Sequence, residues 1–304
     1  MNRRKFIANA SYTGLLLSTG TYPLFASPSE PEIERLTILH TNDVHSRIEP
    51  FPMDGSKNEG LGGVAKRATL ISRIREEQKN VLLLDAGDIF QGTPYFNFYG
   101  GELELKLMSQ LGYDAGTIGN HDFDAGVEGL AKQMKHANFP LLVTNYNFAN
   151  TAMQGKTQNY RIFRKGGVRI GVFGVGIELK GLVPDKLYGD TQYSDPVAAA
   201  QKWGEILRHE EKCDYIICLS HLGYKYNEDK VSDRVLAQNT SNIDLIIGGH
   251  THTFMKEPER LVNKDGKPVL INQVGWAGIV LGRLDVYFEK NKKGTCITCK
   301  NLTV

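Results

Sequence analysis

Residues 117–124, with the sequence TIGNHDFD, place an amide, an imidazole and two carboxylates directly behind a short apolar run. Four other segments repeat this design, because an apolar run of strand length is again followed by side chains that can bind metal ions. The apolar runs are residues 36–39, 81–84, 215–219 and 245–247, and the side chains behind them are Asp43, His45, Asp85, Asp88, His221, His250 and His252. Ligands of α/β proteins bind beyond the carboxyl ends of the strands, where segments distant in sequence converge. We therefore expect the five loops to meet at one site.

The spacing within two of these loops favours the same interpretation. Asp43 and His45 are two residues apart, as are His250 and His252. Side chains two residues apart point the same way when the backbone is extended. With an extended backbone, both pairs could bind ions.

The rest of the sequence alternates between strand and helix patterns, which predicts an α/β fold. Apolar residues recur at helical spacing over residues 63–78, and further helices are expected at 102–111, 126–136, 196–211 and 233–238. Besides the runs already named, strands are expected at 115–118, 141–143, 160–163 and 168–175. From Val269 onward only strands are expected, with turns at residues 275–278 and 290–294 that suggest a hairpin closing one sheet.

Length and composition fit a globular protein with one catalytic domain. The 304 residues are 41% hydrophobic and 23% charged, which are ordinary values for a chain that buries one sizeable core. Residues 3–7 (RRKFI) open a segment without charged residues up to Glu30, a pattern typical of a twin-arginine export signal. We expect a signal peptide at residues 1–26, a spacer at 27–35 and a catalytic domain at 36–304, in a periplasmic or otherwise exported protein. The apolar runs are shorter than the roughly 20 residues that cross a bilayer, so no stable membrane span is expected.

The charge balance argues against a nucleic-acid polymer as a partner. Residues 1–26 hold three basic and no acidic residues, so without them the formal net charge falls from +2 to −1. A nucleic-acid binder needs a basic stripe for phosphate contacts, and no such run occurs outside the signal.

The four cysteines do not make a disulfide framework in a chain of this length. Cys213 and Cys218 are expected in the core as small apolar residues. Cys296 and Cys299 have a spacing known from redox and zinc sites, but a second half-site is missing from the sequence. We therefore expect no metal or redox role for them.

Seven candidate ligands combine carboxylate, amide and imidazole groups without a thiolate. They are Asp43, His45, Asp88, Asn120, His221, His250 and His252. Such a set suits borderline divalent ions such as Zn, Mn, Fe or Co. Because seven ligands exceed what one tetrahedral ion takes, we expect two ions that share a carboxylate and lie about 3.5–4 Å apart. This geometry clamps the attacking and leaving oxygens of a displacement at phosphorus.

A simpler alternative is that aspartates and histidines at strand ends only cap helices and satisfy backbone groups. That alternative suits a single such residue. Five of the eight histidines lie in or beside these loops, together with two aspartates and Asn120, and a metal site explains this concentration better.

Five short motifs resemble, in order, the signatures of calcineurin-like metallophosphoesterases. They are DVH at 43–45, GD at 87–88, GNHD at 119–122, SH at 220–221 and GHTH at 249–252. The segments LHTND at 39–43, GGVAKR at 62–67, GDIFQGT at 87–93 and GNHDFD at 119–124 are similar to the 5'-nucleotidase branch of that family. The resemblance covers residue 36 to the C-terminus, and it implies a four-layer sandwich of two mixed β-sheets flanked by helices.

The resemblance also implies roles for the candidate residues. Two divalent ions would be bound, with Asp88 as their bridge. The other ligands would be Asp43, His45 and His252 for one ion, and Asn120, His221 and His250 for the second. His121 would stay off the metals and meet the substrate phosphate beside Asn120. Asp124 lies three residues further on and is predicted to orient the His121 ring and favour its imidazolium form.

The expected function is that of an exported dinuclear phosphoesterase, in which metal-activated water attacks the phosphorus of phosphate monoesters, above all 5'-nucleotides. The open alternatives are cleavage of cyclic nucleotides, other phosphodiesters or a sulfur ester, and a binding subunit without turnover. No bridging aspartate, asparagine or motif histidine is missing, which favours the enzyme.

Two departures from the branch concern the substrate site. Asp122 stands where the branch often has Glu, and we expect little effect from this difference. The branch usually continues into a second domain near the position of Val304, so we expect a separately encoded C-terminal domain that docks over the metal cleft and improves nucleotide selectivity. The alternative is a smaller pocket formed by the loops at 47–60 and 179–193, which contain Phe51 and Tyr188.

Overall fold

The computed structural model describes residues 33–289 and 295–304. The expected signal peptide, most of the expected spacer and the expected turn at residues 290–294 lie outside the described residues. The first strand, β1, already begins at Ile33, within the segment predicted as the spacer. In the described part of the chain, no helix has both the length and the apolar character needed to cross a membrane.

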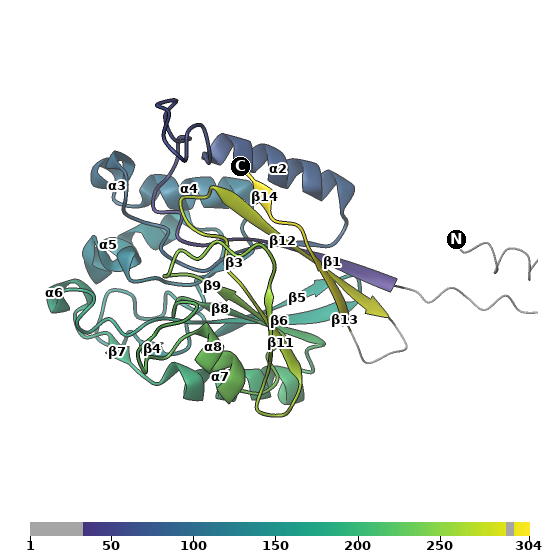
Figure 1. Cartoon of the computed structure of the whole chain (residues 1–304). Helices are drawn as coiled ribbons and strands as arrows, with labels where there is room; N and C mark the ends of the chain where they lie inside the picture. Colours follow the sequence, from purple (N-terminus) through teal and green to yellow (C-terminus); the bar gives the residue numbers. More distant parts are fainter. Residues whose placement is uncertain (1–32, 290–294) are drawn as a thin grey trace, which may run out of the picture.

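Two six-stranded sheets form the centre of the molecule (Figure 1). In the first sheet the strand order is β13-β12-β1-β2-β3, and β14 pairs with β12 at the side. β1, β2 and β3 are parallel, whereas β12 is antiparallel to β1 and to β13, which confirms the C-terminal hairpin. The strands are β1 (Ile33–Thr41), β2 (Val81–Asp85), β3 (Ala115–Gly116), β12 (Val280–Glu289), β13 (Thr295–Cys299) and β14 (Leu302–Thr303).

The second sheet has the strand order β10-β11-β9-β8-β6-β5. Its four central strands are parallel, and β5 and β10 are antiparallel strands at the two edges. The strands are β5 (Tyr160–Lys165), β6 (Val168–Val175), β8 (Tyr215–Ser220), β9 (Leu245–Gly248), β10 (Glu259–Val262) and β11 (Pro268–Asn272). A separate two-stranded sheet consists of β4 (Tyr146–Asn147) and β7 (Gln192–Tyr193).

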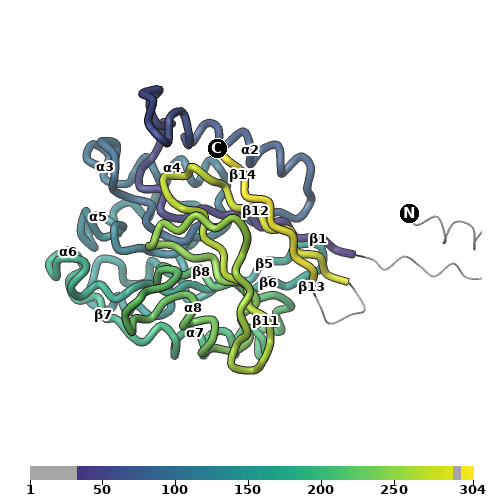
Figure 2. Tube along the Cα trace, in the orientation of Figure 1, coloured from purple at the N-terminus to yellow at the C-terminus, as the bar shows by residue number. Residues whose placement is uncertain are grey.

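Helices cover the outer faces of both main sheets, so the molecule has four layers (Figures 1 and 2). The first sheet is covered by α2, α4 and α5, and the second by α7 and α8. The α-helices are α2 (Val64–Glu77), α3 (Pro94–Tyr99), α4 (Glu102–Leu111), α5 (Gly126–Gln133), α6 (Asp185–Tyr188), α7 (Pro196–Glu205) and α8 (Asp233–Asn239). Three further helical turns are His121–Phe123, Met134–His136 and the π-helical Ile206–Glu210. The expected α/β four-layer sandwich is confirmed.

The apolar strand sequences follow from burial on both faces. Ile38 of β1 and Ile217 of β8 belong to the core between the sheets. The next residue of β1, Leu39, belongs to the core between the first sheet and its helices. Because successive side chains of a strand point to opposite faces, a strand covered on both faces is apolar throughout.

Short elements account for most differences from the predicted pattern. α3, α6, β4, β7 and β10 were not predicted, and none of them exceeds six residues, which is too short for a clear periodicity. Residues 141–143 were predicted as a strand but form only isolated bridges, from Leu141 to Gly116 and from Leu142 to Gln158. Leu141 and Leu142 are nevertheless buried, which explains the apolar pattern without a strand.

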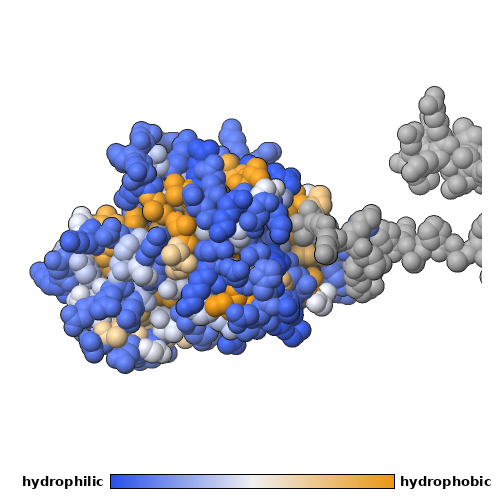
Figure 3. Space-filling model, turned by 90° about the horizontal axis from the view of Figure 1, so that it is seen from below, coloured by the Kyte–Doolittle hydropathy of each residue, from blue (hydrophilic) through white to orange (hydrophobic). Residues whose placement is uncertain are grey.

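Most large apolar side chains lie in the three cores. The face shown in Figure 3 is hydrophilic over most of its area, with hydrophobic side chains in separate patches. Within residues 33–289 and 295–304, the exposed large hydrophobic residues are Ile33, Met53, Phe98, Tyr99, Leu182, Phe254 and Val262.

The core between the sheets should contribute much of the stability. Ile38→Ala removes a fully buried side chain and should lower the free energy of unfolding by about 2–5 kcal/mol. Ile33→Ala makes the same chemical change in the same strand, where the residue is 56% exposed, and should stay within about 0.5 kcal/mol of the parent. Urea denaturation of both variants measures the difference, and equal losses would contradict this description of the core.

Candidate metal centre

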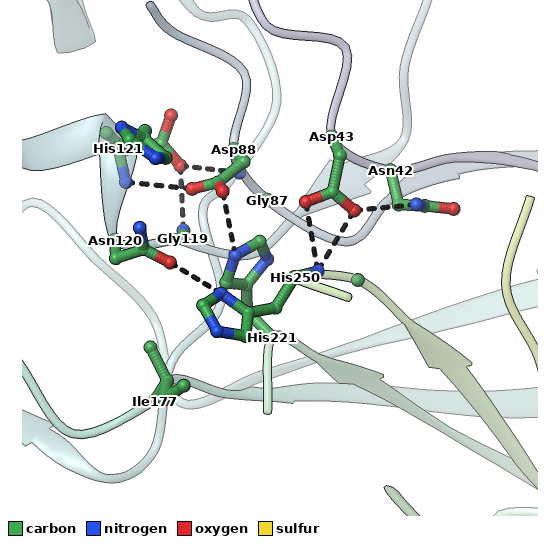
Figure 4. Close-up of polar contacts among 12 residues, drawn as sticks. Asn42, Asp43, Gly87, Asp88, Gly119, Asn120, His121, Ile177, His221 and His250 are labelled. Carbon is green, nitrogen blue, oxygen red and sulfur yellow. Dashed lines mark hydrogen bonds and ion pairs between the residues drawn. The ribbon is translucent and has the colours of Figure 1, made fainter. Parts of the chain in front are cut away.

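The side chains behind four strands of the two sheets, β1, β2, β8 and β9, form two adjoining clusters of candidate metal ligands. Within each cluster the ligand atoms lie within 4.8 Å of one another. The first consists of Asp43, His45, Asp88 and His252, and the second of Asp88, His221 and His250. The two clusters share the carboxylate of Asp88, which lies among the polar side chains of the close-up (Figure 4).

The backbone at these ligands is left-handed, so the extended backbone on which the spacing argument depended is not present. Asp43, His45, Asp88, His250 and His252 have φ values of 51°, 51°, 54°, 73° and 50°. Positive φ is uncommon outside glycine and costs about 1–3 kcal/mol per residue. The chain turns sharply at the end of each strand, and Asp43 and His45 lie in the same cluster, whereas His250 and His252 lie in different clusters.

Hydrogen bonds between the loops hold this strained backbone. The amide of Asp43 donates to the carbonyl of Gly87 (2.9 Å), and the amide of His45 donates to the carbonyl of Asp88 (3.0 Å). The carbonyl of Asp43 accepts a bond from the amide of Ala277 (2.7 Å). The loops after β1, β2 and β11 are therefore fixed to one another through their backbones.

Asp122 ties the Asp88 loop to the loop after β3, and its importance was missed in the sequence. Its carboxylate accepts four backbone hydrogen bonds, from Gly119 (2.7 Å), Asp88 (3.1 Å), Ile89 (2.9 Å) and Phe90 (3.1 Å). Burial raises the pKa of Asp122 to about 7, although the backbone donors oppose this shift. No pattern around Asp122 indicates these four partners, because three of them lie more than thirty residues away in the chain.

Close packing of the backbone explains the glycine at position 119. A Cβ atom added there would lie 2.2 Å from Oδ1 of Asp88, which no real structure tolerates. The same Oδ1 accepts a hydrogen bond from the amide of His121 (2.8 Å) (Figure 4). Glycine at this position therefore lets the β3 loop approach the shared carboxylate.

His221 and Asp88 form a buried pair that fits a cation. Nδ1 of His221 donates to the carbonyl of Ala86 (2.7 Å), which leaves Nε2 facing Oδ2 of Asp88 at 3.1 Å. A neutral ring would turn a lone pair toward the carboxylate, so a proton or a metal ion is needed at this point. Burial opposes a charge on His221, but the Asp88 carboxylate raises the pKa of His221 to about 10.

His45 completes the first cluster with His252. Nε2 of His45 lies 3.0 Å from Nε2 of His252, and 3.8 Å from Oδ2 of Asp88. Nε2 of His252 lies 3.3 Å from Oδ1 of Asp43. Two imidazole nitrogens and two carboxylates thus converge, which is the donor set expected for a Zn, Mn, Fe or Co ion.

His250 and Asn120 face each other in the second cluster. Nδ1 of His250 lies 2.8 Å from Oδ1 of Asn120, and the amide of His250 donates to both carboxylate oxygens of Asp43 (2.9 and 3.0 Å). Burial, assisted by nearby His221, lowers the pKa of His250 to about 4. The neutral ring is the form that binds metals.

His121 and Asp124 lie beside the clusters but belong to neither of them. Nδ1 of His121 lies 2.9 Å from Oδ2 of Asp124, and the His121 side chain is 39% exposed. The Asp124 hydrogen bond raises the pKa of His121, while partial burial opposes the shift. His121 thus combines an accessible ring with a group that favours its charged form.

Other histidine and cysteine predictions concern residues outside the site. His40 is fully buried, accepts a hydrogen bond from Asn272 (2.8 Å) and has its pKa lowered to about 3 by burial. Cys213 and Cys218 are buried free thiols, as expected for core residues.

Comparison with known proteins agrees with this geometry. A family model described as calcineurin-like phosphoesterase matches residues 36–254. The snake venom 5'-nucleotidase of Gloydius brevicauda is 36% identical over 275 residues, covering 84% of this chain and 45% of the venom protein. The 5'-nucleotidase of Bos taurus is 35% identical over 284 residues, covering 86% of this chain and 48% of its own. The structure of a 5'-nucleotidase precursor from Thermus thermophilus matches with a TM-score of 0.78 and 33% identity, covering 89% of this chain and 54% of that one.

The fold and the donor set agree with this match, and the chain belongs to the calcineurin-like phosphoesterase family. Within this family it is related to the 5'-nucleotidases. The chain spans about half the length of the curated relatives it matches.

The four hydrogen bonds of Asp122 give a test of how the site is built. Asp122→Asn turns an NH₂ group toward two backbone donors, which should cost about 1–3 kcal/mol of stability for the groups left unpaired. Because Asp88 is then poorly held, metal affinity should fall by about 10–100-fold, the usual effect of losing an outer partner. Thermal unfolding and equilibrium dialysis measure the two effects.

Asp54→Asn is the matched control, because Asp54 is exposed on the loop before α2. It should leave both quantities unchanged. An Asp122→Asn variant with the stability and metal affinity of the parent would show that Asp122 does not hold the loop.

Proposed function

We propose that this protein hydrolyses phosphate monoesters, in the first place nucleoside 5'-phosphates, at a dinuclear metal centre. The observation that carries the proposal is that two clusters of candidate ligands share Asp88, while His121 lies beside them with its ring accessible. The similarity to 5'-nucleotidases supports the substrate class.

The two clusters would hold one divalent ion each, of the Zn, Mn, Fe or Co type. Asp43, His45 and His252 would bind the first ion, and Asn120, His221 and His250 the second, with Asp88 between them. Such ions, when bound, lower the pKa of water and polarise phosphoryl oxygens.

Asn120 is placed to hold the substrate phosphate. Its Oδ1 faces His250 at 2.8 Å, so the amide group has a fixed orientation. Its Nδ2 makes no hydrogen bond within the described residues and is free to donate to a phosphate oxygen. The residue would thus serve both the second ion and the substrate.

His121 is placed to act on the leaving oxygen. Because Nδ1 is bonded to Asp124, the proton for the substrate is on Nε2. The raised pKa of His121 favours the imidazolium, whose charge stabilises the phosphoryl oxygens. When the ester bond between phosphorus and oxygen breaks, Nε2 donates its proton to the leaving oxygen. A water oxygen takes the fourth position on phosphorus, and the surplus proton of that water restores His121.

We also propose that the twin-arginine motif at residues 3–7 directs export to the periplasm, which the sequence pattern supports. Binding of a separately encoded C-terminal domain over the metal cleft likewise stays a prediction. The proposed contacts of Asn120 and His121 concern the phosphate group, so recognition of the base requires a measurement of its own.

A substrate series on the metal-loaded protein tests the proposed function. We expect hydrolysis of nucleoside 5'-monophosphates, little cleavage of cyclic nucleotides, bis(p-nitrophenyl) phosphate or a thiosulfate ester, and loss of activity in Asp88→Asn. Comparison with ribose 5-phosphate measures how much the base contributes. Faster cleavage of the diesters or of the thiosulfate ester would overturn the monoesterase proposal, and no turnover of any substrate would favour a binding subunit.

The pair of His121 and Asp124 predicts a change in the pH profile. His121→Ala should lose about 10²–10⁴-fold in turnover, the usual contribution of a positioned acid, and should keep its metals. Since Asp124 raises the pKa of His121, the imidazolium persists to higher pH, and activity falls as the pH rises through that pKa. Asp124→Asn lowers this pKa, so the fall should begin at lower pH, with a smaller loss of turnover. Rates against pH and elemental analysis check these outcomes.

His209→Ala is the control, because His209 is exposed in the helical turn Ile206–Glu210 that follows α7. It should leave the pH profile unchanged. Parallel loss of metal and activity in His121→Ala would make His121 a ligand instead.

A further inference from the structure

Trp276 stacks on a candidate metal ligand, and the sequence analysis did not single it out. Its ring is nearly parallel to that of His252, with an interplanar angle of 7° and centroids 5.7 Å apart. Such an offset stack is a favourable arrangement for aromatic rings. His252 belongs to the first metal cluster, and Trp276 lies on the loop after β11.

Two other imidazoles of the clusters, those of His45 and His221, face backbone carbonyls through Nδ1. Nδ1 of His45 lies 3.3 Å from the carbonyl of Phe90, and Nδ1 of His221 lies 2.7 Å from that of Ala86. A carbonyl acceptor of this kind fixes the orientation of a ligating ring. In the described part of the chain, Nδ1 of His252 has no such acceptor, and the polar contacts of the ring are both made by Nε2, with Nε2 of His45 (3.0 Å) and Oδ1 of Asp43 (3.3 Å).

His252 is also the least enclosed of these three ligands. Its side chain is 40% exposed, compared with 8% for His45 and 0% for His221. The ring can therefore turn away from the cluster unless a neighbour restricts it. The face of Trp276 and the edge contact with His45, at 5.0 Å and 69°, are the ring contacts that do so.

Trp276 itself is held firmly on both sides. The carbonyl of Gly275 accepts a hydrogen bond from Nδ2 of Asn42 (2.6 Å), and the amide of Ala277 donates to the carbonyl of Asp43 (2.7 Å). Phe51 contacts the Trp276 ring edge-on, with centroids 5.8 Å apart. The indole is thus a fixed wall rather than a mobile surface group.

We propose that Trp276 is a positioning residue that orients His252 and thereby sets the affinity of the Asp43, His45, Asp88 and His252 cluster for its ion. This inference rests on the proposed dinuclear centre, because it assigns a role toward one of the two ions. It predicts that the two ions respond differently to changes at Trp276, since within the described residues no imidazole of the second cluster stacks on the indole.

Metal affinity of three variants tests the proposal without any substrate. Competition of the full-length protein with a chromophoric chelator for Zn²⁺ gives the two dissociation constants. In Trp276→Ala one of them should rise by about 10-fold or more, as for other lost outer partners, while the other stays as in the parent. Trp276→Phe keeps an aromatic face and should restore most of the affinity. Trp203→Phe, on α7 against Tyr160, is the matched control and should leave both constants unchanged.

Fluorescence gives a second readout that a general loss of structure would not mimic. The chain has two tryptophans, so Trp203→Phe leaves Trp276 as the single emitter. Zn²⁺ should change the emission of that variant, saturating with one ion, and should leave Trp276→Phe, which retains Trp203, without a response. Circular dichroism reports whether Trp276→Ala folds, and if it does not, the fluorescence titrations and the Trp276→Phe affinity decide the question.

The outcomes separate this inference from the function on which it rests. The inference is overturned if the parent protein binds two ions, Trp276→Ala has the same two dissociation constants, and the emission of Trp276 does not change with Zn²⁺. This result would leave the dinuclear centre intact. A parent protein that binds no ion overturns both. A parent protein that binds two ions but hydrolyses no phosphate ester overturns only the proposed reaction.

Discussion

The buried carboxylate of Asp88 is the group on which the rest of the site depends. It is 1% exposed, and an ionised carboxylate in such a place is costly without a positive partner. Burial opposes its ionisation, but His221 and His45 hold the pKa of Asp88 below its usual range. His45 follows β1 in one sheet and His221 follows β8 in the other, so this single charge couples the two sheets at their carboxyl ends.

Placing that charge requires a backbone that no loop would adopt alone. The left-handed residues around Asp88 are stabilised by bonds between loops, because each loop supplies the partner of another. Asp122 has the largest share in this arrangement, since one carboxylate satisfies four amides from two loops. Backbone strain concentrated at a site, and offset by the surrounding structure, is a common feature of functional regions.

The layered fold and the residue types of the site could both be predicted from the sequence. Strands such as β8 are apolar throughout because both faces are covered, and this pattern is visible in the chain itself. The candidate ligands were recognisable because they stand directly behind such runs. The left-handed backbone at Asp43, the four bonds of Asp122 and the stack on Trp276 were not predictable, since each depends on how loops from different strands lie together. Elements of a few residues, such as β10, carry too little pattern to be recognised.

The positions of the candidate ligands along the chain have a consequence for folding. They extend from Asp43 to His252, so most of the described chain lies between the first and the last of them. The complete donor set exists only when both sheets are formed, and an ion that binds it binds the native state alone. By mass action, free metal at about 100 times its dissociation constant adds about 2.7 kcal/mol to the free energy of unfolding. Metal supply in the compartment where the chain matures would therefore act on the yield of folded protein, before any substrate is met.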